Sequence, residues 1–512
     1  MAQPDTLILD GSPLTIDEVV AVARGRRSVS VDPSVRQSLD STRSKLDALT
    51  TDGNAYYGIN TGFGSLARTR IDSDKLRELQ GNLIRSHAAG VGEPLEEGVV
   101  RGMMLLLAAS LSRGYSGVRP IVVETIVAWL NAELTPVVPS LGSVGASGDL
   151  APLAHVALSM MGEAPTIDGR TPQDAGIAPL ALEAKEGLAL INGTHLMAGR
   201  AALILSDYAH LWHAALAANA MSIDAFRASD SYLDARAHAV RNTCQTGTIA
   251  ANLYMMLEGS EILPSHKTDD PRVQDPYSFR CSPYVFGAAS QLVNQVHEAV
   301  VAELGAVTDN PLLFENGNTL DVVSAGNFHG MPIAIPLDTL AIAVCHIAGI
   351  SERRVFAILA ASDPETHLLP YLSHGPGLHS GLMIAQYTAA ALVNEIAQLA
   401  NPASVINLPT SAGIEDYNSF GPRSAEKAAR AVDLAVNVVA IELICAAEGI
   451  EFHRPLKSGV AIEEGIRRIR EVVPSFSQDR SPSPAIEAVS DLIRAGSLDD
   501  LADFAPSCQE HE

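Results

Sequence analysis

The sequence contains few aromatic residues and few basic ones. Phe, Trp and Tyr make up 5% of the 512 residues, and only two of them are Trp. Because β-rich chains draw on aromatic and β-branched residues, this deficit argues against a β-sandwich. Lys and Arg number 35 against 59 Asp and Glu, which gives a formal net charge of −24. A nucleic-acid binder normally carries a basic face, so this balance argues against nucleic acid as a partner.

Metal-binding and secretion signatures are also scarce. The five cysteines are widely spaced and form no C-x-x-C pair, and the 15 histidines form no H-E-x-x-H pattern. We therefore expect no metal, no disulfide framework and a reducing, cytoplasmic location. Residues 1–18 contain acids and lack the apolar core of a signal peptide. The longest uncharged stretch, 375–394, includes Gly, Pro, His, Gln and Asn, so we interpret it as a buried helix and its approach rather than a membrane span.

Apolar residues, by contrast, are abundant. Hydrophobic residues make up 47% and charged residues 18%, which excludes a disordered chain. Several apolar runs are longer than an average helix: 195–228, 285–304, 333–361, 382–399 and 424–447. Helices that are apolar on more than one face need neighbours on more than one side, so we predict a mainly α fold with a central bundle that extends across subunits. We place one domain boundary, between an N-terminal region 1–205 and a helical region 206–512.

A Gly-rich passage, Gly142-Ser-Val-Gly-Ala-Ser-Gly-Asp149, leads into a predicted helix near Pro152. The residues alone favour a loop in which Asp149 caps the helix. A phosphate loop is a second interpretation, although the G-x-x-G-x-x-G spacing matches neither the dinucleotide nor the Walker pattern. A third is self-cyclisation, in which the Gly148 nitrogen attacks the Ala146 carbonyl carbon. The absence of a Cβ in Gly148 permits that close approach. Loss of water and of the Ser147 hydroxyl would then leave an electrophilic methylidene on an imidazolone ring.

The passage Gly145-Ala-Ser-Gly-Asp-Leu-Ala-Pro152 resembles the segment from which the aromatic amino-acid ammonia-lyases and the related 2,3-aminomutases form a methylidene-imidazolone group, called MIO. The resemblance runs from about residue 50 to 460 and rests on seven further motifs in the family's order: Tyr57-Gly-Ile-Asn-Thr-Gly-Phe-Gly64, Ser86-His-Ala-Ala-Gly90, Leu190-Ile-Asn-Gly-Thr194, Gln274-Asp-Pro-Tyr-Ser-Phe-Arg280, Asp309-Asn-Pro311, Gly326-Asn-Phe-His329 and Glu415-Asp416.

The resemblance implies a fold, a cofactor and an assembly. The fold would be an aspartase-like long-helix bundle with an N-terminal globular region that carries MIO. The cofactor would be MIO formed autocatalytically from Ala146, Ser147 and Gly148, with no metal. The assembly would be a homotetramer whose active sites are each shared between subunits and take a small amino-acid substrate, with no nucleic acid or membrane as partner.

The resemblance also implies a role for each matched residue. Tyr57 would be the general base that removes a β-hydrogen. Arg280 would hold the substrate carboxylate, because a planar guanidinium binds a carboxylate in bidentate fashion. The remaining matched positions have supporting roles: Tyr277 in proton handling, Asn192 and Asn327 on the carboxylate or the MIO carbonyl, Gln274 beside the substrate, and Phe328 packed beside the MIO ring.

Two positions bear on the choice of substrate. Ser86-His87 resembles the histidine ammonia-lyases, but some tyrosine aminomutases look similar here, and a His can bond an imidazole or a phenol. Glu415 also resembles the histidine ammonia-lyases, and a carboxylate pairs with an imidazolium or ammonium but gains nothing from a neutral aromatic ring. His195, Tyr417 and the pair Gly413-Ile414 depart from the histidine pattern. We therefore expect elimination of ammonia from L-histidine to give trans-urocanate in amino-acid catabolism, with a tyrosine or phenylalanine ammonia-lyase or 2,3-aminomutase as the alternative. A scaffold without catalysis is argued against by the intact Ala146-Ser147-Gly148, and a fumarase-type lyase by the lack of that group's Gly-Ser-Ser loop.

Overall fold

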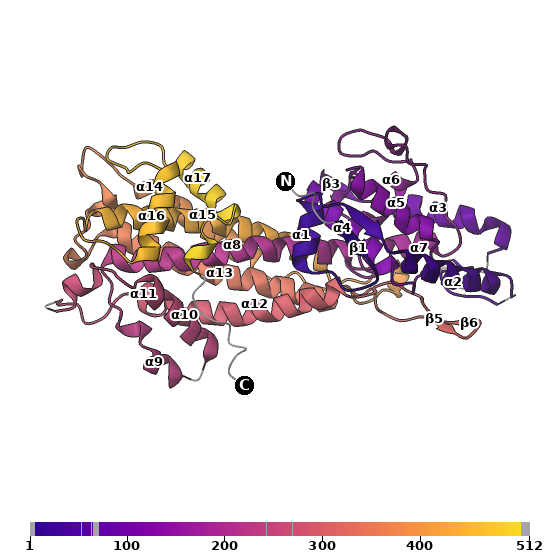
Figure 1. The fold of residues 1–512 in the computed structure, drawn as a ribbon, viewed down its shortest axis with the longest axis horizontal. Coiled ribbons are helices and arrows are strands. Elements are labelled where there is room, and N and C mark those ends of the chain that lie inside the picture. The colour runs from indigo at the N-terminus through magenta and orange to yellow at the C-terminus, as the bar shows by residue number, and fades with distance from the viewer. Residues whose placement is uncertain are drawn as a thin grey trace. The chain divides into compact units, whose positions relative to one another are not determined.

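The computed structural model describes residues 6–502 except 53, 63, 65–70, 242 and 269. Phe63, within the tyrosine motif, and Cys508 therefore lie outside the described residues. The chain is mainly helical (Figure 1), which confirms the predicted fold class. The predicted long helices are all present as α8 (His195–Phe226), α12 (Ser282–Leu304), α13 (Met331–Ala360), α14 (Met383–Leu399) and α15 (Gly421–Glu451).

The chain forms two compact units, each assembled from segments that are distant in sequence. The first unit comprises Met1–Ser206, Val296–Asp338 and Pro402–Glu426, and the second comprises Asp207–Gln295, Thr339–Asn401 and Lys427–Glu512. The single domain boundary between residues 205 and 206 therefore stays a prediction.

The first unit packs short helices around apolar centres and includes three two-stranded sheets. Its helices are α1 (Ile16–Ala23), α2 (Pro33–Thr50), α3 (Leu76–His87), α4 (Glu97–Leu111), α5 (Pro120–Asn131), α6 (Leu150–Met160) and α7 (Glu186–Ile191). Its strands pair as β1 (Leu7–Leu9) with β2 (Val29–Val31) in parallel, and as β3 (Val91–Pro94) with β4 (Pro139–Leu141) and β5 (Leu312–Asn316) with β6 (Thr319–Val323) in antiparallel fashion.

Local sequence explains where several of these helices begin and why they are buried. Thr15 and Glu18 form a capping box at the start of α1. Asp32 accepts the Ser34 N–H at the start of α2, where Pro33 takes a first-turn position. Helix α4 is apolar all round and is buried along nearly its whole length, as expected for a central helix. The loops of the first unit carry the polar residues discussed below.

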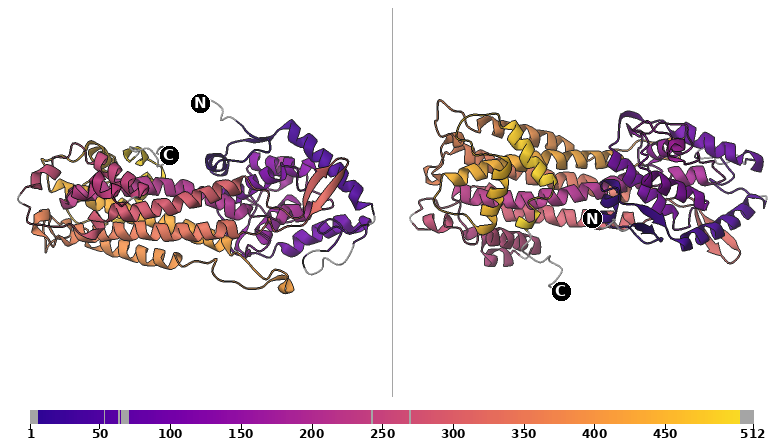
Figure 2. Two further views of the ribbon diagram at one scale, coloured as in Figure 1. Left: turned by 90° about the horizontal axis from the view of Figure 1, so that it is seen from below. Right: turned by 45° about the horizontal axis from the view of Figure 1, so that its top comes forward.

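The second unit contains long helices that run side by side (Figure 2), together with shorter ones. The shorter helices are α9 (Ala235–Ala239), α10 (Cys244–Met256), α11 (Tyr277–Arg280), α16 (Val460–Val472) and α17 (Ser483–Arg494). Cys281, Cys345 and Cys445 are free thiols, whereas Cys244 is disulfide-bonded. The spacing of cysteines in the sequence did not predict that bond, because it does not report distances in the fold.

One helix among the described residues is long and apolar enough to cross a membrane. This helix is α13, and 61% of its most apolar window is buried inside the protein. Buried core helices have the same length and composition, so α13 is weak evidence for a membrane span.

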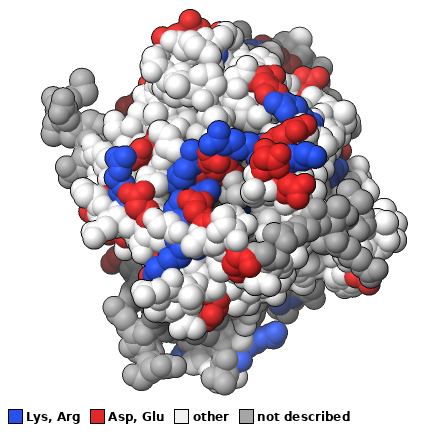
Figure 3. Space-filling view, turned by 90° about the vertical axis from the view of Figure 1, so that its right-hand side faces the viewer, with Lys and Arg blue, Asp and Glu red and all other residues white. Residues whose placement is uncertain are grey.

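Charged side chains on the surface are mixed in sign. Figure 3 shows basic and acidic side chains side by side on one face of the molecule. In the first unit, Arg36 pairs with Glu124 at 2.8 Å and Arg26 pairs with Glu97 at 3.3 Å. The basic side chains are therefore interspersed with acidic ones on this face, within a net charge of −24.

Candidate active site

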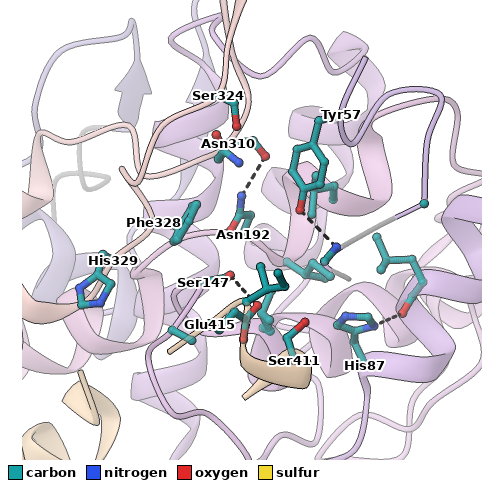
Figure 4. Close-up of a pocket in the computed structure, with 18 of the residues that line it drawn as sticks. Tyr57, His87, Ser147, Asn192, Asn310, Ser324, Phe328, His329, Ser411 and Glu415 are labelled. Carbon is teal, nitrogen blue, oxygen red and sulfur yellow. Dashed lines mark hydrogen bonds between the residues drawn. The ribbon is translucent and has the colours of Figure 1, made fainter. Parts of the chain in front are cut away.

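The first unit contains a cavity of about 910 Å³ that gathers most of the predicted site residues (Figure 4). Its volume lies in the range of small-molecule sites. The predicted residues that line it are Tyr57, His87, Ala146, Ser147, Asn192, Phe328 and Glu415. They come from loops and helix ends that are up to several hundred residues apart in the chain, so the fold rather than the sequence brings them together.

The Ala146-Ser147-Gly148 segment is a tight turn between β4 and α6. Gly148 has a φ of +74°, and a Cβ at this position would overlap the backbone of Gly193. The Asp149 N–H donates to the Gly193 carbonyl at 2.7 Å, and the Ser143 hydroxyl donates to the Gly148 carbonyl at 3.1 Å. Within the described part of the chain, the Gly148 N–H donates no hydrogen bond. The turn therefore holds the neighbouring groups while leaving this nitrogen uncommitted.

Asp149 anchors this turn to the start of α8. Its buried carboxylate accepts the Leu196 N–H at 2.9 Å and the Met197 N–H at 3.2 Å. Burial raises the pKa of Asp149 to about 7, and the hydrogen bonds from these two amides oppose that rise. The sequence favoured Asp149 as the cap of α6, but its side chain instead satisfies the first-turn amides of α8.

Glu415 lies directly against the serine of this turn. The Ser147 hydroxyl donates to Glu415 Oε1 at 3.2 Å, and the Thr410 hydroxyl donates to Oε2 at 2.8 Å. Glu415 and Asp416 are acidic, and among the described residues that line the cavity none is Lys or Arg. The lining by itself thus favours a positively charged group over a negative one.

His87 ends α3 and presents its ring to the same cavity. Its Nδ1 lies 2.9 Å from the Leu83 carbonyl oxygen, which can only accept a hydrogen bond. Nδ1 therefore carries the proton, and Nε2 of the neutral ring is an acceptor. Burial lowers the pKa of His87, while the Leu83 hydrogen bond and the charge of Glu415 oppose that shift.

Tyr57 lies in a turn whose approach to α7 requires glycine. Gly58 has a φ of +69°, and a Cβ there would overlap the Leu188 side chain. The Tyr57 phenol oxygen accepts the Gly64 N–H at 3.5 Å. Tyr56 does not line the cavity, and its hydroxyl donates to Asp52 at 2.6 Å. Of these adjacent tyrosines, only Tyr57 presents its hydroxyl to the cavity.

Comparison with known proteins decides the family. A family model described as aromatic amino acid lyase matches residues 14–471. The chain belongs to the aromatic amino acid lyase family. It is 42% identical to a histidine ammonia-lyase of Anaeromyxobacter sp. (strain K) over 97% of this chain and 100% of that relative.

Solved structures of this lyase family have the same fold. The histidine ammonia-lyase of Trypanosoma cruzi has a TM-score of 0.88 and 37% identity, covering 97% of this chain and 95% of that one. The tyrosine aminomutase of Streptomyces globisporus has a TM-score of 0.90 and 32% identity, covering 98% and 100%. These matches confirm the family and the fold predicted from the motifs.

Some predicted site residues do not line the cavity of this lyase. Gln274, Tyr277 and Arg280 belong to the second unit, where Arg280 donates to the Gln274 side chain at 2.9 Å and lies 4.5 Å over the Tyr277 ring. Tyr277 is 70% exposed. Gly148 and Asn327 belong to the first unit but do not line the cavity. The Asn327 amide donates to the Val307 carbonyl at 3.3 Å. The described residues that line the cavity thus do not include the predicted carboxylate clamp.

Sequence reasoning also missed residues that line the cavity. They are mostly small polar or apolar side chains without a chemical signature: Leu79, Asn82, Leu83, Leu150, Leu188, Ile191, Asn310, Ser324, Ala325 and Ser411. Asn310 stands in a recognised motif and could have been assigned from it. Tyr417 and Ile414, which depart from the histidine pattern, also line the cavity, so these departures lie where a substrate would be contacted.

His195, another departure, gives this lyase a pH-dependent stability. Its ring is buried, and neither ring nitrogen has a hydrogen-bond partner in the described part of the chain. Burial lowers its pKa to about 4, against a small opposing effect of Asp309. Because the folded pKa is below the unfolded value, the neutral ring's contribution is complete above pH 6.5 and is lost as pH falls towards 4. The loss amounts to about 3 kcal/mol.

We expect His195→Gln to remove this part of the acid sensitivity. When urea midpoints are measured at several values between pH 7 and 4, the midpoint of the wild type should fall further than that of the variant. If the urea midpoints of the wild type and of His195→Gln fell equally with pH, His195 would not change its protonation on unfolding.

Proposed function

We propose that the protein is a histidine ammonia-lyase that converts L-histidine into trans-urocanate and ammonia. The observation that carries the proposal is the pairing of Glu415 with Ser147 in a cavity that also holds His87. His87 Nε2 accepts the N–H of an imidazole, and the carboxylate of Glu415 stabilises a positive charge on the imidazole or the amine. The relatives named histidine ammonia-lyase support the same substrate.

The residues present fit a MIO group formed from Ala146, Ser147 and Gly148. The left-handed Gly148, its uncommitted N–H and the Ser147 hydroxyl at the cavity supply the atoms that the cyclisation uses. MIO, when formed, supplies an electrophile that takes up the substrate amine and makes it a better leaving group. We propose no metal in this reaction.

The side chains around this turn orient the substrate and move its proton. Tyr57 removes the β-hydrogen as general base, and Phe328 excludes water beside the reacting atoms. Glu415 and His87 hold the side chain of the substrate in place. A β-hydrogen held against the Tyr57 oxygen is transferred in an effectively unimolecular step.

The substrate carboxylate needs a cation, and none stands among the described residues that line the cavity. Arg280, with Tyr277 and Gln274 beside it, supplies that cation from a second copy of the chain in a homotetramer with shared active sites. Asn327 belongs to the same carboxylate-binding set. The exposed Tyr277 and the Arg280 guanidinium stacked over it suit a position that another subunit covers. We further propose a cytoplasmic enzyme of amino-acid catabolism.

A substrate panel tests the proposal. L-Histidine, L-tyrosine and L-phenylalanine are each supplied, and the conjugated acid product is followed by ultraviolet absorbance. We expect turnover of histidine above the other two. Turnover of tyrosine without histidine would establish the alternative of a tyrosine ammonia-lyase or 2,3-aminomutase, which the departures at Ile414 and Tyr417 and the fold match to a tyrosine aminomutase favour.

Glu415→Gln should weaken the preference for histidine. Glutamine keeps the shape of the side chain but removes its charge. A hydrogen bond to a charged group contributes more than one to a neutral group, so kcat/KM for histidine should fall by about 10- to 100-fold. The kcat/KM values for tyrosine and phenylalanine should fall less. An equal fall for all three amino acids would mean that Glu415 does not recognise the imidazole.

A further inference from the structure

A buried ion pair lies behind the cavity. Lys185 Nζ and Asp309 Oδ2 are 2.6 Å apart, and their side chains are 0% and 2% exposed. Neither residue lines the cavity. Lys185 also has a φ of +74°, a left-handed conformation that strains a non-glycine residue. Burying two charges costs desolvation free energy that replacement by apolar residues would avoid, so the pair is better explained by what it positions than by stability.

Asp309 contacts Asn192, which lines the cavity. Its other oxygen, Oδ1, accepts the Asn310 N–H at 2.6 Å and lies 3.3 Å from Asn192 Nδ2. Asn192 Nδ2 also donates to the Asn310 carbonyl at 3.0 Å, the contact drawn in Figure 4. The Lys185–Asp309 ion pair therefore lies directly behind a side chain that lines the cavity.

The contacts of Asn192 determine which way its amide faces. The Asp309 carboxylate and the Asn310 carbonyl are both acceptors only. The terminal atom of Asn192 that faces them must be the NH₂ group, and both of its hydrogens are then used. The amide oxygen is left over. In the described part of the chain Asn192 Oδ1 is buried and has no hydrogen-bond partner, which costs free energy unless a ligand donates to it.

We propose that Lys185 and Asp309 are positioning residues that hold Asn192 with its amide oxygen as an acceptor for the substrate amine. An amide oxygen attracts an N–H group and repels a carboxylate. This geometry differs from the family-based expectation that Asn192 holds the carboxylate or the MIO carbonyl, which would need a free N–H. The inference rests on the proposed function, because it assigns the amine of the same amino-acid substrate.

The test compares two ligands that differ only in the amine. Steady-state kinetics give kcat/KM for L-histidine, and competitive inhibition gives Ki for 3-(imidazol-4-yl)propanoate, which keeps the ring and carboxylate but has no amine. In Asp309→Asn, the introduced amide NH₂ can donate a hydrogen bond to the Asn192 oxygen. The Asn192 side-chain amide can then rotate by half a turn, so that its oxygen no longer faces the substrate amine. We expect kcat/KM to fall by about 10- to 100-fold with Ki unchanged. Lys185→Met, which removes the charge opposite Asp309, should act in the same direction.

Glu186→Gln is the matched control. Glu186 is adjacent in sequence and equally buried, but it pairs with Arg119 and does not line the cavity. Glu186→Gln should lower the melting temperature, but it should not change kcat/KM for L-histidine relative to Ki for 3-(imidazol-4-yl)propanoate. Intact mass confirms that each variant carries the same modification as the wild type.

Two results would overturn the inference. An equal loss for both ligands would place Asn192 on the carboxylate, and a change in neither would make the ion pair merely structural. A wild type that turns over none of the three amino acids refutes the proposed function instead, and calorimetric binding of the same two ligands then still decides the inference.

Discussion

Ser147→Ala will give a folded protein with almost no turnover. The substitution removes only the hydroxyl that lines the cavity and its hydrogen bond to Glu415. The turn itself is held by other groups, namely the Gly193 carbonyl and the side chains of Ser143 and Asp149. Without a serine hydroxyl to lose, no methylidene forms. Most of the enzyme's acceleration, which in enzymes is typically at least about 10⁶-fold over solution, should disappear with it.

Intact-protein mass and kcat/KM for histidine check this prediction together. The wild type should weigh two waters less than its sequence, whereas the mass of Ser147→Ala should be free of that two-water loss. Ser159→Ala is the matched control. Ser159 lies on α6, the helix that follows the turn, and its buried hydroxyl donates to the Pro165 carbonyl. It does not line the cavity. Ser159→Ala should keep both the two-water loss and turnover. A wild type with the unmodified mass would contradict the proposed enzymatic function itself.

Helices and their burial followed from the sequence because their signal is local. The apolar run 333–361 predicts a helix wherever its neighbours lie, and α13 spans Met331–Ala360. The units could not be predicted in the same way. The first unit takes up Val296–Asp338 and Pro402–Glu426 from distant parts of the chain. Such long-range packing leaves no periodic pattern in any one segment.

The site divides along a similar line. Tyr57, Ser147 and Glu415 could be named because their motifs match a family, and the fold places all three on one cavity. The Ser147–Glu415 hydrogen bond joins residues 268 positions apart, so no local signal reveals it. Lys185 carries no motif at all and draws attention only through its burial and its partner Asp309.

Tyr57→Phe should keep the modified mass but lose most of kcat. Among the adjacent pair Tyr56 and Tyr57, only Tyr57 lines the cavity, and its oxygen accepts the Gly64 N–H. A positioned general base contributes about 10²- to 10⁴-fold, so kcat should fall by that factor. The KM should change little, because phenylalanine keeps the ring and the substrate amine and carboxylate are held elsewhere.

Tyr56→Phe separates this role from the packing of the loop. Tyr56 is next in sequence and loses the same atom, but its hydroxyl is bound to Asp52 on the other side of the turn. It should show wild-type kcat and at most a small loss of stability, since the lost hydrogen bond is near the surface. Equal losses of kcat in both variants would assign the effect to the loop's conformation. A loss in Tyr57→Phe alone, with the two-water mass difference intact, assigns it to proton removal.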